Sequence, residues 1–281
     1  MKPTWLIEQG VYGNQAAAFR SEVERQGMVC AEVRYQPGKQ PPNDILGVPP
    51  LADDACVVLW GTLPLMRQIQ LRRSWSPGGW CDLDNLECST YYDYFGPYLL
   101  NNDYTILTGA EATRRQDQLF DEFGAEDEVF VRPGCVLKLF TGTVAYKDSF
   151  RSAIAPSRYD PETQIVVSTP KEIGREWRLV IVGDDIAASS QYRDHGAVSV
   201  AGGCPDNVSL FVTDILQQVQ WRPDEVFMMD VCESNGKLHL LELNSFSCSG
   251  LYDCELSAVI RAAGAAAENK WIAEYGSGSD R

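Results

Sequence analysis

The stretch VFMMDVCESNGKLHLLELN, residues 226–244, decides how the second half of this chain folds. Two runs with strand-like alternation flank an Asn-Gly pair, a pattern typical of a β-hairpin. Three oxygen-bearing side chains interrupt the apolar positions: Asp230 in the first strand, and Glu242 and Asn244 in the second. Two neighbouring buried carboxylates repel each other and lose their hydration, so we expect a positive charge between them.

The turn of this hairpin decides whether the three polar side chains share one face. With a two-residue Asn-Gly loop, Asp230 pairs with Leu241 and the two acids point to opposite faces. With a three-residue Ser-Asn-Gly loop whose glycine is left-handed, Asp230 pairs with Leu240 and all three polar side chains share a face. Oxygen ligands without His or Cys favour Mg²⁺ over zinc, so a shared face predicts a magnesium site. The structural alternative is that Asp230 caps a bulge while Glu242 pairs with an arginine.

The N-terminal region has the pattern of an α/β domain. Residues 4–9, 29–35 and 55–60 are apolar runs of strand length, and 14–26 has helical spacing between the first two runs. Strands that alternate with helices favour a parallel sheet. Neither GxGxxG nor GxxxxGK[ST] occurs in the expected places, so dinucleotide binding is not supported here.

The chain changes character near residue 110. Paired strands followed by helices predict α+β structure over 111–275, with a flexible tail at 276–281. The fold class that we expect is therefore α/β plus α+β, with a parallel-sheet α/β domain over 1–110 followed by a two-lobed domain.

Charge and hydropathy exclude several classes of protein. The chain has 281 residues, with 39 acidic and 24 basic side chains and a formal net charge of −15. Nucleic-acid binding depends on clustered Lys and Arg, which are missing, so we expect no nucleic-acid partner. No apolar run approaches the roughly 20 residues that span a membrane, and the N-terminus does not resemble a signal peptide. We therefore expect a cytoplasmic protein that does not bind membranes.

The nine cysteines do not form a recognisable metal motif. No CxxC pair occurs, and the chain has only two histidines, so a zinc site is disfavoured. Reduced, mostly buried thiols are the expectation.

Three segments together resemble the ATP-grasp superfamily. VFMMDVCESNGKLHLLELNSFSCSGLY (226–252) resembles the end of ATP-grasp ligases, where an Asp on one strand and Glu-x-Asn on the next hold the magnesium ions of ATP. EVFVRPGCVLKLFTGTV (128–144) resembles the strand and loop that cover the phosphates, and QIVVSTPKEIGREWRLVIV (164–182) resembles the adenine hinge and the next strand. The combination looks like a branch met in bacteria and their viruses. It implies an ATP-grasp domain over 111–275 and a preceding domain that helps to form the acceptor site.

The resemblance implies roles for individual residues that bind ATP and metal. Asp230, Glu242 and Asn244 correspond to the metal-binding positions. Arg132 replaces a phosphate-contacting lysine, and Lys138 becomes the second phosphate cation and a catalytic group. The remaining nucleotide-binding positions are Thr169, Pro170, Lys171 and Glu172 at the hinge, and Glu176 near the ribose or the hinge.

The same resemblance suggests where the other substrates bind. Arg178, also assigned a catalytic role, and Arg193 would receive an acyl phosphate or a substrate carboxylate, because arginine binds such anions through two N–H groups. Tyr192 recurs at strand spacing with Ser190 on the partner strand and is followed by Arg193, and Ser247 and Ser249 would cradle the acyl group. The alternative for both arginines is an ordinary solvated face.

These residues predict an ATP- and Mg²⁺-dependent carboxylate–amine ligase that works through an acyl phosphate and forms an amide or peptide bond. Its substrates would be a small-molecule or peptide carboxylate and an amine. Two alternatives stay open: a kinase of the same fold, which would release ADP without free phosphate, and a non-catalytic nucleotide-binding module.

Overall fold

A mainly parallel sheet begins the chain. The structure, a computed structural model, describes residues 1–40, 44–135, 140–154 and 160–276. The first sheet has the order β3-β2-β1-β4-β5, in which only the short β3 runs antiparallel to its neighbour. Its elements are β1 (Thr4–Glu8), α1 (Asn14–Arg25), β2 (Val29–Tyr35), β3 (Ile45–Leu46), β4 (Cys56–Trp60), α2 (Leu63–Arg72) and β5 (Ser76–Gly78).

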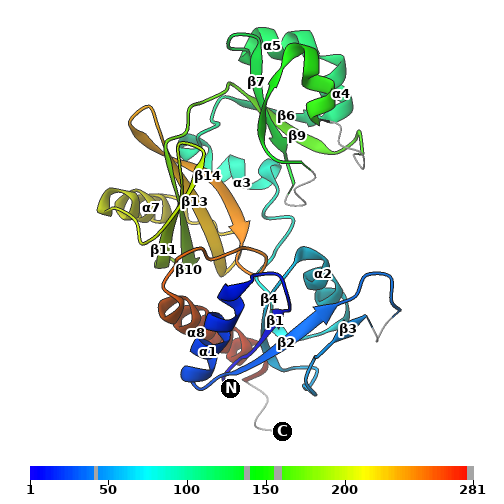
Figure 1. Cartoon of the computed structure of the whole chain (residues 1–281), viewed down its shortest axis with the longest axis vertical. Helices are drawn as coiled ribbons and strands as arrows, with labels where there is room; N and C mark the ends of the chain where they lie inside the picture. Colours follow the sequence, from blue (N-terminus) through cyan, green and yellow to red (C-terminus); the bar gives the residue numbers. More distant parts are fainter. Residues whose placement is uncertain (41–43, 136–139, 155–159, 277–281) are drawn as a thin grey trace.

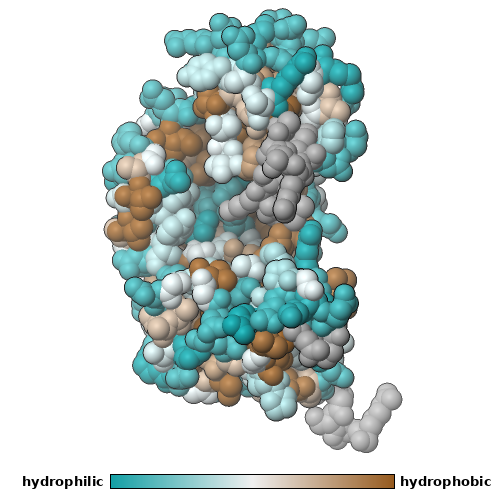
Figure 2. Space-filling model, turned by 45° about the vertical axis from the view of Figure 1, so that its right-hand side comes forward, coloured by the Kyte–Doolittle hydropathy of each residue, from teal (hydrophilic) through white to brown (hydrophobic). Residues whose placement is uncertain are grey.

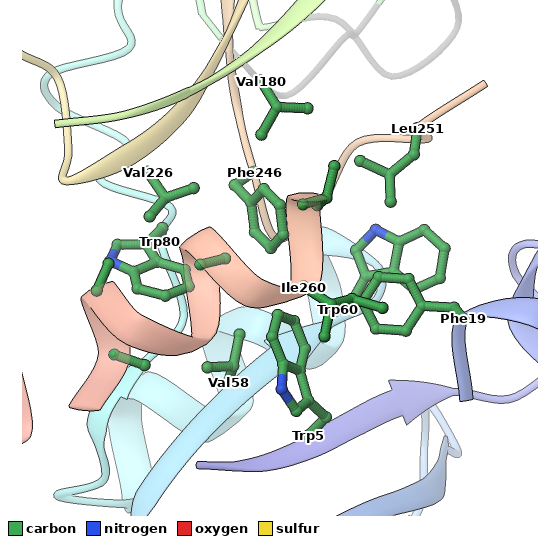
Figure 3. Packing of buried hydrophobic residues seen from close by; sticks show 14 of the residues in the cluster. Trp5, Phe19, Val58, Trp60, Trp80, Val180, Val226, Phe246, Leu251 and Ile260 are labelled. Atoms are coloured by element: carbon green, nitrogen blue, oxygen red, sulfur yellow. The ribbon is translucent and has the colours of Figure 1, made fainter. Parts of the chain in front are cut away.

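Side chains of this sheet alternate between two cores. Trp5 and Val58 point toward α1 and the C-terminal helix α8 (Leu256–Tyr275), whereas Leu6 and Leu59 pack with α2. Every residue of β4 is buried, as expected for a parallel strand with both faces covered. Figure 3 shows the first of these cores, with aromatic side chains gathered around α8.

An antiparallel sheet occupies the middle of the molecule (Figure 1). Its order is β12-β11-β10-β13-β14. The elements of this layer are α3 (Cys88–Phe95), η1 (Gly96–Tyr98), β10 (Arg175–Val182), β11 (Asp185–Asp194), β12 (Ala197–Gly202), α7 (Asp206–Gln218), β13 (Val226–Ser234) and β14 (Lys237–Ser245). One face, with Trp177 and Met229, packs on α3 and α7. The other face, with Val180 and Met228, joins the core around α8.

A second antiparallel sheet forms the upper lobe in Figure 1. Its order is β6-β9-β7-β8, and its helices surround a separate core that includes Phe120 and Phe150. We call this part the small lobe. Its elements are β6 (Tyr104–Thr108), α4 (Gly109–Arg114), α5 (Gln116–Phe123), β7 (Glu128–Pro133), β8 (Thr143–Tyr146), η2 (Lys147–Ser149), α6 (Phe150–Ile154) and β9 (Gln164–Ser168).

The C-terminal helix α8 joins the first two sheets. It contacts α1, β4 and β5 on one side and β10 and β11 on the other, so the two sheets share one core. The expected combination of a parallel-sheet α/β part with antiparallel α+β parts is confirmed. The domain division near residue 110 stays a prediction, and the tail lies largely outside the described residues. Within the described ranges, helices that combine the length and the apolar character needed to cross a membrane are absent.

Candidate active site

A tight turn and a bulge decide how the two acids lie. The hairpin has a two-residue Asn-Gly turn in which both residues have positive φ, +49° and +71°. Val231 pairs with Leu240, but Asp230 pairs with Glu242, which leaves Leu241 as an extra residue on β14. The three-residue loop is therefore wrong, and the bulge rather than the turn places both acids on one face.

Asp230 and Arg178 form a bidentate ion pair across two neighbouring strands. They are opposite each other in the register of β10 and β13. Arg178 Nε and Nη2 donate to the two carboxylate oxygens of Asp230 at 2.8 and 2.6 Å, and Nη1 donates to the Gly250 carbonyl at 3.0 Å. The two side chains are only 1% and 8% exposed, for Asp230 and Arg178 respectively. Arg178 thus supplies the expected positive charge and does not lie on a solvated face.

Glu242 has a different partner. Arg132 on β7 donates from Nη2 to Glu242 Oε2 at 2.8 Å and from Nη1 to the bulged Leu241 carbonyl at 3.5 Å. Because β7 belongs to the small lobe, this pair connects that lobe with the central sheet. The contact is the arginine pairing that the structural alternative expected for Glu242.

Asn244 connects the two acids. Its Nδ2 donates to Asp230 Oδ2 at 3.1 Å and to Glu242 Oε1 at 2.9 Å, so three potential oxygen ligands converge on one side of the hairpin. A flip of the amide would present its oxygen instead of its nitrogen. Across the described part of the chain no group of three or more His, Cys, Asp or Glu side chains suits a metal. Two carboxylates and one amide nevertheless have the donor chemistry that fits Mg²⁺.

A buried carboxylate and two stacked tyrosines lie beside Arg178. Tyr192 donates its hydroxyl hydrogen to Glu176 Oε2 at 2.7 Å, and burial raises the pKa of the Glu176 carboxyl. The rings of Tyr192 and Tyr252 stack with their centroids 4.9 Å apart. The Arg178 guanidinium carbon lies 5.1 Å from the centre of the Tyr252 ring, within the range of a cation–π contact.

Tyr252 and the residue that holds it are not among the site residues predicted from the sequence. Tyr252 has a φ of +51°, a backbone conformation that is uncommon for a bulky residue. Gln15 at the start of α1 clamps this backbone: its Nε2 donates to the Tyr252 carbonyl at 2.5 Å, and its Oε1 accepts from Leu251 N at 3.4 Å. No local pattern signals this contact, because the partners are more than 230 positions apart.

A cavity of about 400 Å³ is lined by the two ion pairs described above together with Asn244, Glu176 and the two tyrosines. Figure 2 shows the surface hollowed between the small lobe and the rest of the molecule. The predicted site residues that line it are Arg132, Glu176, Arg178, Tyr192, Arg193, Asp230, Glu242 and Asn244. Apolar side chains also contribute, among them Leu86, Phe130, Phe140 and Ile173. A charged ligand with a flat apolar ring is compatible with this lining.

The other predicted residues lie elsewhere. The segment between β9 and β10 contains the predicted hinge residues Thr169, Pro170, Lys171 and Glu172, followed by Ile173. Ile173 lines the cavity, and the four hinge residues do not. Lys171 forms an ion pair with Asp103. Lys138 lies outside the described residues.

Ser247 and Ser249 make hydrogen bonds to the N-terminal part of the chain and do not line the cavity. Ser247 Oγ accepts from Trp80 N at 3.0 Å, and its carbonyl accepts from Gly61 N at 2.9 Å. The Ser249 carbonyl accepts from Trp60 Nε1 at 2.8 Å. These contacts connect the loop after β14 to the first sheet, so the structure does not bring either serine to the cavity lining.

Comparison with solved structures shows a shared fold over nearly the whole chain. The D-alanyl-alanine synthetase A of Vibrio cholerae O1 has a TM-score of 0.62 at 12% identity, covering 96% of this chain and 99% of its own. The D-alanine–D-alanine ligase of Coxiella burnetii has a TM-score of 0.61 at 13% identity, covering 98% and 100%. The D-cycloserine synthetase DcsG has a TM-score of 0.58 at 9% identity, covering 94% and 99%.

Sequence comparison gives the family. No curated protein sequence matches the chain. A family model described as the ATP-grasp domain of R2K clade family 2 matches residues 113–262, which is more than half of the chain. This match covers β7, the hinge and the β13–β14 hairpin, and it agrees with the fold. The chain therefore belongs to the R2K clade of the ATP-grasp superfamily.

Proposed function

We propose that this protein is an ATP- and Mg²⁺-dependent ligase that joins a carboxylate to an amine through an acyl phosphate. The observation that carries the proposal is the convergence of Asp230, Glu242 and Asn244 on one face, flanked by Arg178 and Arg132, at a cavity with apolar lining. ATP needs this combination: cations and a magnesium site for its phosphates, and apolar surface for its base.

The two arginines have different roles in the proposed reaction. Arg178 uses three of its five N–H groups on Asp230 and Gly250, so two remain for an oxyanion of the carboxylate or the acyl phosphate. Arg132 is the cation that can exchange Glu242 for a phosphate oxygen. Asp230, Glu242 and Asn244 would then hold Mg²⁺, which supplies charge neutralisation for phosphoryl transfer.

The catalytic step needs no nucleophile from the protein. The substrate carboxylate attacks the γ-phosphorus of ATP and ADP leaves; the amine then attacks the acyl carbon, and phosphate leaves. Arg178 and Arg132 stabilise the negative charge that develops in both steps. Lys138, which the resemblance assigns to the phosphates, is proposed as a third cation.

The names of the structural neighbours support a ligase over a kinase. Two neighbours are named for joining D-alanine to alanine, and a third is a D-cycloserine synthetase. Carboxylates of amino-acid size are therefore the first class of substrate to test. The kinase and the non-catalytic module remain the alternatives to be separated by experiment.

Oxygen-isotope transfer separates these functions. The purified protein is incubated with ATP, Mg²⁺, a panel of L- and D-amino acids labelled with ¹⁸O in the carboxylate, and hydroxylamine as a generic amine. We expect ADP, phosphate that carries ¹⁸O, and a hydroxamate, because the carboxylate oxygen remains on phosphate when the acyl phosphate breaks.

Other results would reject the ligase. ADP formation with a phosphorylated hydroxyl product and no free phosphate would indicate a kinase. Saturable ATP binding in a thermal-shift titration without ADP formation across a panel that also includes peptides and other carboxylic acids would indicate a binding module. The same assay is run on Glu242→Gln, which removes a carboxylate of the proposed magnesium site. Its matched control is Glu233→Gln, because Glu233 also pairs with an arginine, Arg175 at 2.8 Å, but does not line the cavity.

A further inference from the structure

Two cysteines from distant parts of the chain meet where the first sheet contacts the loop after β14. Cys81 follows β5 of the first sheet, and Cys248 lies in the loop after β14. Their sulfur atoms are 3.9 Å apart, although 167 positions separate them in the sequence. Cys81 is buried and Cys248 is half-buried, and both are free thiols. The proposed ligase mechanism uses neither of them.

The backbones around both cysteines are held against each other. Ser247, the residue before Cys248, accepts a hydrogen bond from Trp80 N at 3.0 Å and donates its own N–H to the Trp80 carbonyl at 3.3 Å. A Cβ on Gly79 would approach Ser247 Oγ to 3.2 Å and overlap the end of the Met66 side chain. Trp80 and Phe246 also pack edge to face, as Figure 3 shows. The sulfur atoms therefore face each other within a well-defined contact.

The surroundings of the thiols favour reaction between them. Hydrogen bonds from the Cys248 thiol and the Ser245 hydroxyl lower the pKa of Cys81, whereas the contact with Cys81 and burial raise the pKa of Cys248, so Cys81 is the thiolate of the pair and Cys248 the thiol. Cys248 N donates to Ser245 Oγ at 3.2 Å, which holds the loop so that its thiol points toward Cys81. A thiolate stabilised beside a second thiol is the usual arrangement for disulfide formation.

We propose that Cys81 and Cys248 form a modification site at which a peroxide converts the two thiols to a disulfide. One thiolate attacks a peroxide oxygen, which gives a sulfenic acid and releases water after protonation. The sulfur of the second thiol then attacks the sulfenic sulfur and forms the S–S bond; its proton goes to the leaving hydroxide, which departs as the second water. Two thiols lose two electrons and two protons, and hydrogen peroxide is reduced to two molecules of water.

The disulfide would covalently join the first sheet to the loop that supports the active site. This loop continues to Gly250, whose carbonyl accepts from Arg178, and to Tyr252, whose ring lies over the same guanidinium. The bond would also close a long covalent loop and thereby reduce the entropy of the unfolded chain. Oxidised protein should therefore be more resistant to heat than reduced protein, whether or not it is a ligase.

Peptide mass mapping tests the modification directly. Reduced, full-length protein is treated with hydrogen peroxide, alkylated and digested without reductant. We expect a cross-linked peptide pair containing Cys81 and Cys248, lighter than the sum of its parts by two hydrogen atoms and separated by dithiothreitol. Cys81→Ala and Cys248→Ala should each abolish this peptide pair, whereas Cys30→Ala, which removes another half-buried thiol, should retain it.

Thermal unfolding tests the consequence. The oxidised wild type should unfold several degrees above the reduced protein, and either single variant should lose this gain. Sulfinic acid on one cysteine without a cross-link, or cross-links of Cys248 to other cysteines, would overturn the modification site. A cross-link without a rise in melting temperature would overturn the proposed stabilisation by the disulfide. Neither measurement depends on substrate, so failure here is distinguishable from failure of the ligase proposal.

Discussion

The two ion pairs of the candidate site differ in how they are built. Asp230 and Arg178 lie on adjacent strands of one sheet, with side chains that are 1% and 8% exposed. Glu242 and Arg132 belong to the central sheet and the small lobe, with side chains that are 20% and 17% exposed. We call the first the floor pair and the second the bridging pair.

From this difference we infer that the floor pair is a permanent contact and the bridging pair an exchangeable one. The floor pair follows from the register of β10 and β13, and breaking it leaves a buried charge without its partner. The bridging pair depends on the position of the small lobe, and solvent reaches both of its side chains. The floor pair is therefore suited to orienting Arg178, and the bridging pair is suited to releasing Arg132 to a phosphate.

Removal of the acid from the floor pair should have the largest effect on stability. We expect Asp230→Ala to lower the free energy of unfolding by about 3–5 kcal/mol, because Arg178 stays buried and loses its carboxylate. Urea denaturation followed by fluorescence measures this loss. The double variant Asp230→Leu/Arg178→Met should recover much of it, since it removes both charges. A loss in Asp230→Ala no larger than in Glu242→Ala would contradict the distinction.

Removal of the acid from the bridging pair should instead affect turnover. We expect Glu242→Gln to change the free energy of unfolding by less than about 1 kcal/mol. ADP formation should fall by about 100-fold or more, since a ligand of the proposed magnesium site is lost. Steady-state kinetics checks this, with Glu233→Gln at wild-type activity. Full activity in Glu242→Gln would refute its role in metal binding.

Removal of the Gln15 hydrogen bonds that hold the Tyr252 backbone should have a smaller effect on stability and should change substrate binding only at the floor pair. Gln15→Leu removes the hydrogen bonds to the backbone at Leu251 and Tyr252, and we expect a loss of about 1 kcal/mol in stability. The KM for the carboxylate should rise several-fold because Tyr252 no longer holds its place over Arg178, while the KM for ATP stays unchanged. Gln26→Leu is the control, because Gln26 also bonds a distant backbone carbonyl, that of Ser257, outside the cavity. Equal changes in both KM values would argue against a selective role.

Replacement of Glu176 should have the smallest of these effects, which is a change in how stability depends on pH. Burial raises the pKa of Glu176 in the folded protein above its ordinary value of 4.5, so the folded state binds this proton more tightly than the unfolded state. The contribution of Glu176 to stability is therefore present below pH 4.5 and is lost as the pH rises through the raised pKa. Urea midpoints measured against pH should fall less steeply in Glu176→Gln than in the wild type. Identical slopes would show that the carboxyl has an ordinary pKa in the folded protein.

Parts of the site were predictable because strand alternation is a local property. In β10, Glu176 and Arg178 alternate along the sequence with Trp177, and the structure has the first two at the cavity and Trp177 in the core. The order of the three ATP-grasp segments was also sufficient to indicate the superfamily, which the family match confirms. The shared face of Asp230 and Glu242 was predicted too, but from the wrong turn.

The loop after β14 shows what alternation does not determine. Ser247 and Ser249 follow the segment proposed to bind metal, and nothing in their local sequence distinguishes a substrate loop from a structural one. Their hydrogen bonds go to Trp60 at the end of β4 and to Gly61 and Trp80, which follow β4 and β5 of the first sheet. Contacts between segments so far apart depend on how the sheets pack around α8.

The sequence by itself determined which residue types alternate along each strand, and therefore that Glu242 shares a face with Asn244 on one strand and Glu176 shares a face with Arg178 on another. Only the tertiary structure decided the bulge at Leu241, the partner of each acid, the clamp of Gln15 on Tyr252 and the meeting of Cys81 with Cys248. The physical reason is that the side-chain period of a strand is set by its own backbone, whereas these contacts are set by packing between surfaces that adjoin only in the folded chain.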